Sequence, residues 1–261
     1  MLKKILGIFI CTLMIATTLT ATGAINFQTK WLINENNNIQ SYQNAPIDSP
    51  NLIAINIIAK VVSVDDSHNL LGGAIKVNDT IKGKYTYDSN ATDINADPNI
   101  GVYWCNFSTC GIEVKAGGFV FKTDPNDVEF AIAIGNDLVN PNPNGDLYEV
   151  ISFSNLNLSN GLVVYGLEWF LYDPTGTALS GDVLPTTAPV LSKWNQSASG
   201  YGLTLAGYNP TNFSAFTIRA DVTKVAKSRA KDTYYTTQPI LIRLLERFPK
   251  IFPILRHLMK P

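Results

Sequence analysis

The sequence predicts an all-β protein: an antiparallel β-sandwich of jelly-roll type, followed by a short amphipathic α-helical C-terminal tail. Three observations support this prediction. Short stretches of alternating apolar and polar residues run from about residue 51 to residue 226, clusters of Gly, Asn, Asp and Pro separate them, and no long apolar repeat of 3.6 residues occurs before residue 238. Alternation is typical of strands with one buried face, and the clusters supply turn geometry.

Composition limits what the chain does. Of its 261 residues, 46% are hydrophobic and 16% are charged, and disordered chains carry more charge and fewer apolar residues, so most of the chain should fold. The chain has only two histidines, which disfavours a histidine-based metal site or catalytic triad, and no G-x-S-x-G nucleophile motif occurs. We therefore expect no catalytic residues and a protein that is not an enzyme. A polysaccharide hydrolase whose carboxylates converge only in space is the less favoured alternative.

Residues 1–24 have the features of an export signal. Two lysines precede an apolar run over residues 5–16, and Thr22 and Ala24 fit the small-residue positions of a cleavage site. The run is shorter than the roughly 20 apolar residues of a membrane span, which disfavours an uncleaved anchor. We expect this signal peptide to be removed and the protein to be secreted, extracellular or associated with the cell surface.

Four further segments are expected after the signal. Residues 25–50 are polar and rich in asparagine, which is typical of a flexible leader. Residues 51–226 carry the alternating pattern of the β-sandwich domain, residues 227–237 form a linker, and residues 238–261 form the tail.

The first strand of the domain shows the clearest alternation, with an apolar residue at every second position from Ile53 to Val61. A second strand over residues 80–87 has one apolar face and one polar face that carries Lys82 and Lys84. Further strands are expected at residues 102–104, 111–114, 119–122, 128–134, 147–153, 162–172, 202–205 and 213–225.

Two of these segments, residues 59–64 and residues 220–225, resemble one another in sequence. One opens the domain and the other closes it. We predict that they lie side by side and bring the two ends of the domain together. The alternative is that any two alternating strands look alike.

Removal of the signal would leave two cysteines, Cys105 and Cys110. Export and an even count both favour a disulfide between them. Because the loop that it closes is short, we expect a local staple and not the main source of stability. A metal site at these cysteines is disfavoured, since no second cluster of Cys or His exists.

The loop after residue 87 is the most oxygen-rich part of the sequence. Calcium prefers carboxylate and carbonyl oxygens from a flexible loop, so this loop is a candidate calcium site. A standard EF-hand is excluded, because Pro98 stands where the glycine is required and Trp104 where the bidentate glutamate is required. A solvated acidic turn is the alternative, and no other cofactor is expected. The candidate ligands are Asp88, Asp93, Asn95 and Asp97.

Aromatic residues gather in a stretch rich in Gly and Asn near residue 200. Sugar-binding sites on β-sandwiches use aromatic faces with polar neighbours, so carbohydrate binding is the second function that we consider. The candidate residues are Trp194, Tyr201 and Tyr208. The favoured alternative is that these large side chains fill the ends of the sandwich.

In the last segment the apolar period changes from two residues to three or four. Residues 25–222 hold 9 basic and 19 acidic side chains, a net charge of −10, whereas residues 223–261 hold 9 basic and 2 acidic, a net charge of +7. Such a basic amphipathic tail binds an anionic membrane surface, docks on a cell-envelope partner protein, or folds back on its own domain. The acidic domain argues against nucleic acid as a partner. The apolar tail residues are Leu241, Leu244, Leu245, Phe248, Phe252 and Leu255.

Short motifs between about residues 57 and 225 resemble exported bacterial and archaeal domains of unknown function, many of which precede a PEP-CTERM-type sorting tail. The matching segments are residues 59–64, 83–88, 135–137, 146–148, 171–179, 182–186 and 216–225. The resemblance implies a secreted β-sandwich and no particular activity. The C-terminal end departs from the pattern, because it lacks both the Pro-Glu-Pro tripeptide and a spanning hydrophobic run, so the resemblance does not imply processing by a sortase-like enzyme.

Overall fold

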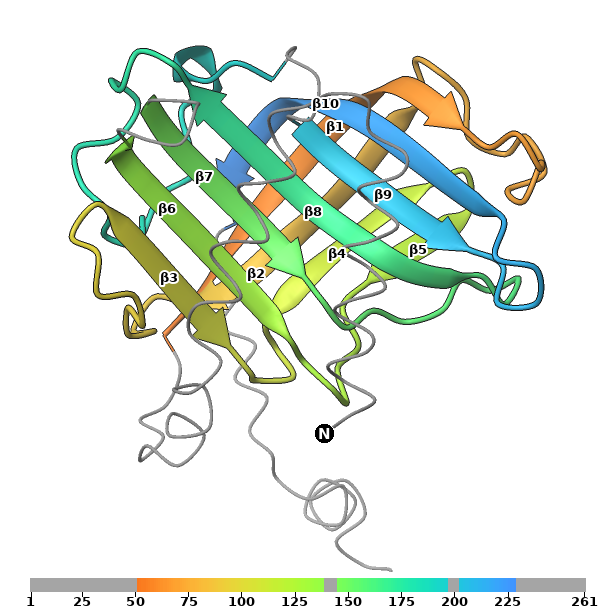
Figure 1. The fold of residues 1–261 in the computed structure, drawn as a ribbon, viewed down its shortest axis with the longest axis horizontal. Helices are drawn as coiled ribbons and strands as arrows, with labels where there is room; N and C mark the ends of the chain where they lie inside the picture. The colour runs from red at the N-terminus through yellow and green to blue at the C-terminus, as the bar shows by residue number, and fades with distance from the viewer. Residues whose placement is uncertain (1–50, 139–144, 197–201, 229–261) are drawn as a thin grey trace, which may run out of the picture. The chain divides into compact units, whose positions relative to one another are not determined.

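The computed structural model describes residues 51–138, 145–196 and 202–228 (Figure 1). These residues form ten strands and one short 3-10 helix, η2 (Leu191–Lys193). The strands are β1 (Leu52–Asp65), β2 (Thr80–Asp88), β3 (Ile100–Cys105), β4 (Gly111–Ala116), β5 (Phe119–Lys122), β6 (Phe130–Leu138), β7 (Gly145–Ser152), β8 (Val163–Asp173), β9 (Gly202–Tyr208) and β10 (Ala215–Lys227).

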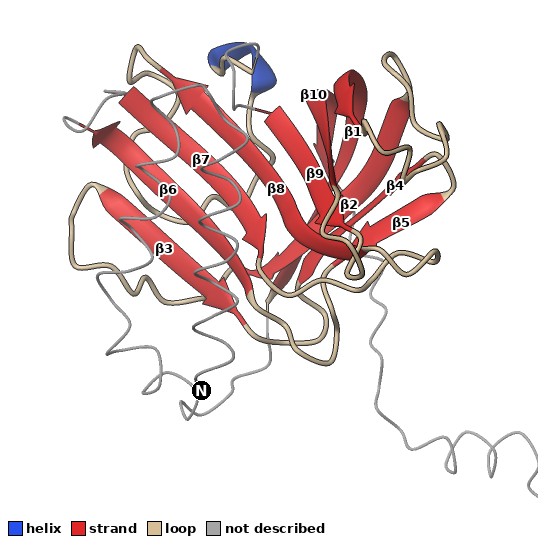
Figure 2. Cartoon of the chain, turned by 45° about the vertical axis from the view of Figure 1, so that its right-hand side comes forward, coloured by secondary structure: helices blue, strands red, loops and turns tan. Residues whose placement is uncertain are grey.

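All ten strands belong to one sheet, in the order β3-β6-β7-β8-β9-β10-β1-β2-β4-β5. Each neighbouring pair is antiparallel, which confirms the prediction of an antiparallel all-β protein. The sheet is continuous and curled, so a sandwich of two separate sheets and a jelly-roll topology are not confirmed (Figure 2). The predicted helical tail lies outside the described residues.

Strands β1 and β10 pair along most of their length. Ala59 lies opposite Val222 and Val61 opposite Ala220, with register shifts on either side. This pairing confirms the prediction made from the similarity of the two segments. It is also the junction between a half of the sheet made by β3 and β6–β10 and a half made by β1, β2, β4 and β5.

The curl of the sheet brings the inner faces of its two ends together around one core. β4 contacts β7, and β5 contacts β8, although these strands are far apart in the strand order. Alternate side chains of each strand point inward, as the period of two predicts. The ring of Phe121 on β5 meets that of Phe216 on β10 edge-on, with centroids 6.3 Å apart.

At the centre of this core, the hydroxyl groups of Tyr85 on β2 and Tyr148 on β7 form a hydrogen bond of 2.9 Å. The ring of Trp169 on β8 lies 5.8 Å from the Tyr85 ring and 6.0 Å from the Tyr148 ring. All three side chains are fully buried. Burial raises the pKa of both tyrosines above the ordinary value, so both remain neutral donors and acceptors.

We predict that Tyr85→Phe lowers the free energy of unfolding by about 1–3 kcal/mol, because it leaves the Tyr148 hydroxyl buried without its partner. Tyr148→Phe should cost a similar amount for the same reason. The double variant should be destabilised by less than the sum of the two, since it removes both polar groups together. Urea unfolding of the four proteins measures this coupling, and strictly additive losses would contradict it.

Candidate functional site

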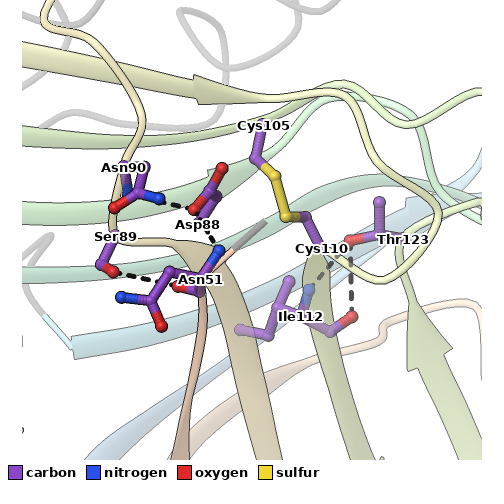
Figure 3. Close-up of a disulfide and its surroundings, with 8 residues drawn as sticks. All are labelled: Asn51, Asp88, Ser89, Asn90, Cys105, Cys110, Ile112 and Thr123. Carbon is purple, nitrogen blue, oxygen red and sulfur yellow. Dashed lines mark hydrogen bonds between the residues drawn. A yellow bond between two sulfur atoms is a disulfide. The ribbon is translucent and has the colours of Figure 1, made fainter. Parts of the chain in front are cut away.

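Asp88, the first predicted calcium ligand, is buried at the end of β2. Its carboxylate oxygen Oδ1 accepts hydrogen bonds from the backbone N–H groups of Asn51, at 2.9 Å, and Asn90, at 3.0 Å (Figure 3). The hydroxyl of Ser89 donates to the Asn51 carbonyl at 3.0 Å. Asp88 therefore ties the start of the described chain to the turn after β2.

The other three predicted ligands each hydrogen-bond the backbone two residues further on. Asp93 accepts from the N–H of Asn95 at 2.9 Å, Asn95 from that of Asp97 at 3.0 Å, and Asp97 from that of Asn99 at 2.9 Å. These are Asx turns, in which the side chain stabilises its own loop. Among the described residues, no group of three or more His, Cys, Asp or Glu is placed to hold a metal ion. Calcium binding at this loop therefore remains a prediction without support from the geometry.

The predicted carbohydrate residues do not come together in the described chain. Trp194 is buried, and its ring lies 6.4 Å from that of Tyr148 in the core. Tyr208 pairs with Val163 at the start of β8, whereas the residue after Trp194 pairs with Tyr172 at the other end of that strand. Tyr201 lies outside the described residues. Tyr208 instead stacks on the exposed ring of Phe213, with centroids 6.0 Å apart.

The structure reveals a polar pocket that the sequence analysis did not assign. It has a volume of about 130 Å³ and lies where β2, β4 and β5 meet the loop between the two cysteines. The sequence feature that could have indicated this pocket is the alternation of Lys84 and Thr86 with apolar residues on β2. The sequence alone did not show which strands lie beside β2. The polar side chains that line the pocket are Lys84, Thr86, Ser108, Thr109, Glu113, Lys122 and Thr123.

Charge in this pocket centres on Glu113. Its carboxylate lies 3.1 Å from the amine of Lys122 and 3.9 Å from the amine of Lys115. Lys84 lies directly opposite Glu113 in the pairing of β2 with β4, and Lys122 lies opposite it on β5. The pocket therefore offers two amines, one carboxylate and several hydroxyls, a set that suits a ligand with both an anionic group and hydroxyl groups.

A disulfide shapes one wall of the pocket. Cys105, at the end of β3, is bonded to Cys110, which confirms the predicted pairing; the two Cα atoms are 6.0 Å apart and both residues are buried (Figure 3). The N–H of Cys110 donates to the carbonyl of Phe107 at 2.8 Å, which closes the loop as a turn. The exposed Ser108 and Thr109 are thus held at the pocket by a covalent link and a backbone hydrogen bond.

The next residue, Gly111, takes the chain from this loop into β4 with a φ of +126°, a region that other residues avoid. A Cβ atom there would lie 2.5 Å from the Thr123 hydroxyl oxygen. That hydroxyl accepts a hydrogen bond from the N–H of Ile112 at 3.0 Å and contacts the Ser152 hydroxyl at 2.8 Å. Thr123 therefore fixes the floor of the pocket, and the exposed lysines and hydroxyls remain for a ligand.

Two buried carboxylates at the other end of the sheet serve the fold. Asp146 accepts from the N–H of Asp137 at 3.0 Å and from that of Leu179 at 2.7 Å. Asp173, only 3% exposed, accepts from the N–H groups of three residues of the following loop, Thr175, Thr177 and Ala178. Burial alone would raise the pKa of Asp173, but hydrogen bonds from the Thr175 hydroxyl and from these N–H groups outweigh it and lower the pKa to about 2.

Comparison of the chain with known protein families, with curated proteins and with solved structures gave no match. Within the described ranges, none of the helices has the length and apolar character that a membrane span requires.

We predict that Asp173 stabilises the fold at neutral pH and that acid removes this contribution. Because the folded pKa lies below that of the unfolded chain, the contribution is complete above about pH 4 and is lost as the pH falls towards about 2. At pH 7, Asp173→Asn should lower the free energy of unfolding by about 2 kcal/mol. Urea unfolding of both proteins across this pH range should show the difference shrinking; a constant difference would contradict the prediction.

Proposed function

We propose that this chain is an exported protein that is retained at the cell surface or in the extracellular matrix, where its all-β domain serves as a non-enzymatic binding module. The export-like residues 1–24, the Cys105–Cys110 disulfide and the resemblance to exported PEP-CTERM-type domains support the proposal. In this proposal the curled sheet encloses its core in the manner of a β-sandwich. Residues 238–261 form an amphipathic helical tail that retains the domain at the cell surface.

The observation that carries the proposal is the position of the two chain ends of the described domain. Ile55 lies opposite Lys227, and the N–H of Ser228 donates to the Ala54 carbonyl at 2.7 Å. The chain therefore enters and leaves the sheet at adjacent points. A module of this kind can be tethered through the segments outside residues 51–228 without any break in the sheet.

The chemistry of the proposed tether comes from its sequence. Residues 223–261 carry a net charge of +7, and the apolar residues from Leu241 to Leu255 recur at steps of three and four. A helix with one basic and one apolar face binds anionic membrane surfaces through both area burial and charge. The same features suit docking on an acidic cell-envelope protein.

We predict that deletion of residues 238–261 releases the protein into the medium, because the domain would lose its attachment while keeping its core. Deletion of residues 26–49, a segment of the same length in the polar leader, is the matched control and should leave the protein with the cells. Immunodetection in cell and medium fractions measures both. Unchanged retention after loss of the tail would contradict the proposal.

A further inference from the structure

Between β9 and β10, the strand order divides into two groups of five strands with opposite net charge. Strands β1, β2, β4, β5 and β10 contain eight basic and four acidic residues, a net charge of +4. Strands β3, β6, β7, β8 and β9 contain five acidic residues and no basic one, a net charge of −5. We call the first group the basic strands and the second group the acidic strands.

Strand register places six of the seven lysines of the basic strands on the outer face of the sheet. The inward positions of β2 hold Ile81, Tyr85 and Tyr87, all buried, so Lys82 and Lys84 point outward. Their partners in the pairing with β1 and β4 share that face. The lysines on this face are Lys60, Lys82, Lys84, Lys115, Lys122 and Lys224, and we call it the lysine face.

Two rows of side chains cross the lysine face. In the first, Lys115 on β4 lies opposite Lys82 on β2, which lies opposite Ile58 on β1, which lies opposite Lys224 on β10. This row spans about 14 Å, or three strand spacings. Like charges in directly opposed positions destabilise a sheet, so the Lys82–Lys115 pair is costly for the fold alone. A polyanion along the row would offset that repulsion.

The second row leads into the polar pocket. It runs from Lys122 through Glu113 to Lys84, and the hydroxyls of Ser108 and Thr109 stand beside it. The backbone of duplex DNA and a phosphatidic acid surface both present phosphates without alcohol hydroxyls, and the Glu113 carboxylate would repel those phosphates. A uronic acid polymer carries both groups: its carboxylates pair with the lysines, and its hydroxyls donate to Glu113 and to the neighbouring oxygens.

We propose that the lysine face and the adjoining pocket bind an acidic polysaccharide, with Lys82 and Lys84 as the central cationic contacts and Glu113 as the acceptor for sugar hydroxyls. The proposal rests on the proposed function in one respect, since export is what would bring the protein to such polymers. The disulfide then acquires a role in the site, because it holds the hydroxyl-bearing loop against the pocket.

The test measures binding of the purified full chain to polygalacturonate, to double-stranded DNA and to phosphatidylcholine vesicles that contain phosphatidic acid, by titration calorimetry. Lys82→Gln/Lys84→Gln is compared with Lys193→Gln/Lys227→Gln, which removes the same charge from lysines outside the lysine face. The amines of these two lysines reach the carbonyls of Thr177 and Thr186, and Lys227 lies opposite the inward-pointing Ile55. Because the basic tail is common to all variants, its contribution cancels in each comparison. Thermal unfolding of each variant confirms that it is folded.

We expect the Lys82/Lys84 variant to bind polygalacturonate about tenfold more weakly and the control variant to stay within about twofold of the unchanged protein. Glu113→Gln should weaken binding to polygalacturonate yet strengthen binding to DNA and vesicles, because only the sugar uses the carboxylate. Equal losses in the two lysine variants would overturn the proposal. So would a gain in affinity for all three probes on Glu113→Gln, which would indicate a general anion surface.

These results are independent of the tether. Binding of purified protein does not depend on cell fractionation, so failure here leaves the tail-deletion result intact. Conversely, if the protein stays with the cells after deletion of its tail, the proposed function fails but binding to the lysine face can still be tested.

Discussion

The pairing of β1 with β10 is the constraint on which the rest of the structure depends. In the strand order it is the junction between the meander from β6 to β10 and the half formed by β1, β2, β4 and β5. It closes the chain over more than 150 residues, as the partners Ala59 and Val222 show. The loop-closure entropy of such a contact is large, so the pairing must be supported by core packing on both sides of it.

That support comes from the buried aromatic side chains. Tyr85 and Tyr148 belong to opposite halves, and their hydroxyl groups satisfy each other where water cannot reach. A buried hydrogen bond of this kind adds little net stability, but a buried hydroxyl without its partner costs considerably more. The pair therefore favours the one alignment of the two halves in which both hydroxyls are satisfied. The same alignment fixes which residues point outward, and it places the basic strands β10, β1, β2, β4 and β5 next to one another.

Much of the fold was predictable from local patterns, because alternation and turn residues act over a few positions. The strands from β1 to β10, the Cys105–Cys110 disulfide and the pairing of residues 59–61 with residues 220–222 were all predicted. The position of β3 beside β6 was not, since it depends on a long-range pairing that no local pattern encodes. For Trp194 the favoured alternative was burial as a large packing residue, and its ring does pack in the core.

The candidate site was harder to predict for related reasons. Asp93, Asn95 and Asp97 have the spacing of cation ligands, but that spacing equally suits Asx turns, and the structure uses them as turns. The lysines lie at scattered positions in the sequence, and they form rows only when β4, β2, β1 and β10 are placed side by side. The overall charge also concealed them, because the negative net charge of the domain masks the positive net charge of the basic strands.

The most direct test of this account is the register between β1 and β10, measured as backbone proton contacts in a nuclear Overhauser spectrum. The structure predicts cross-peaks between Asn56 and Ala226 and between Ile58 and Lys224, because the residues of each pair are directly opposed. Those contacts would establish the junction of the two halves and the place of Lys224 in the row of lysines that crosses it. Contacts shifted along either strand, or none between the two strands, would contradict it.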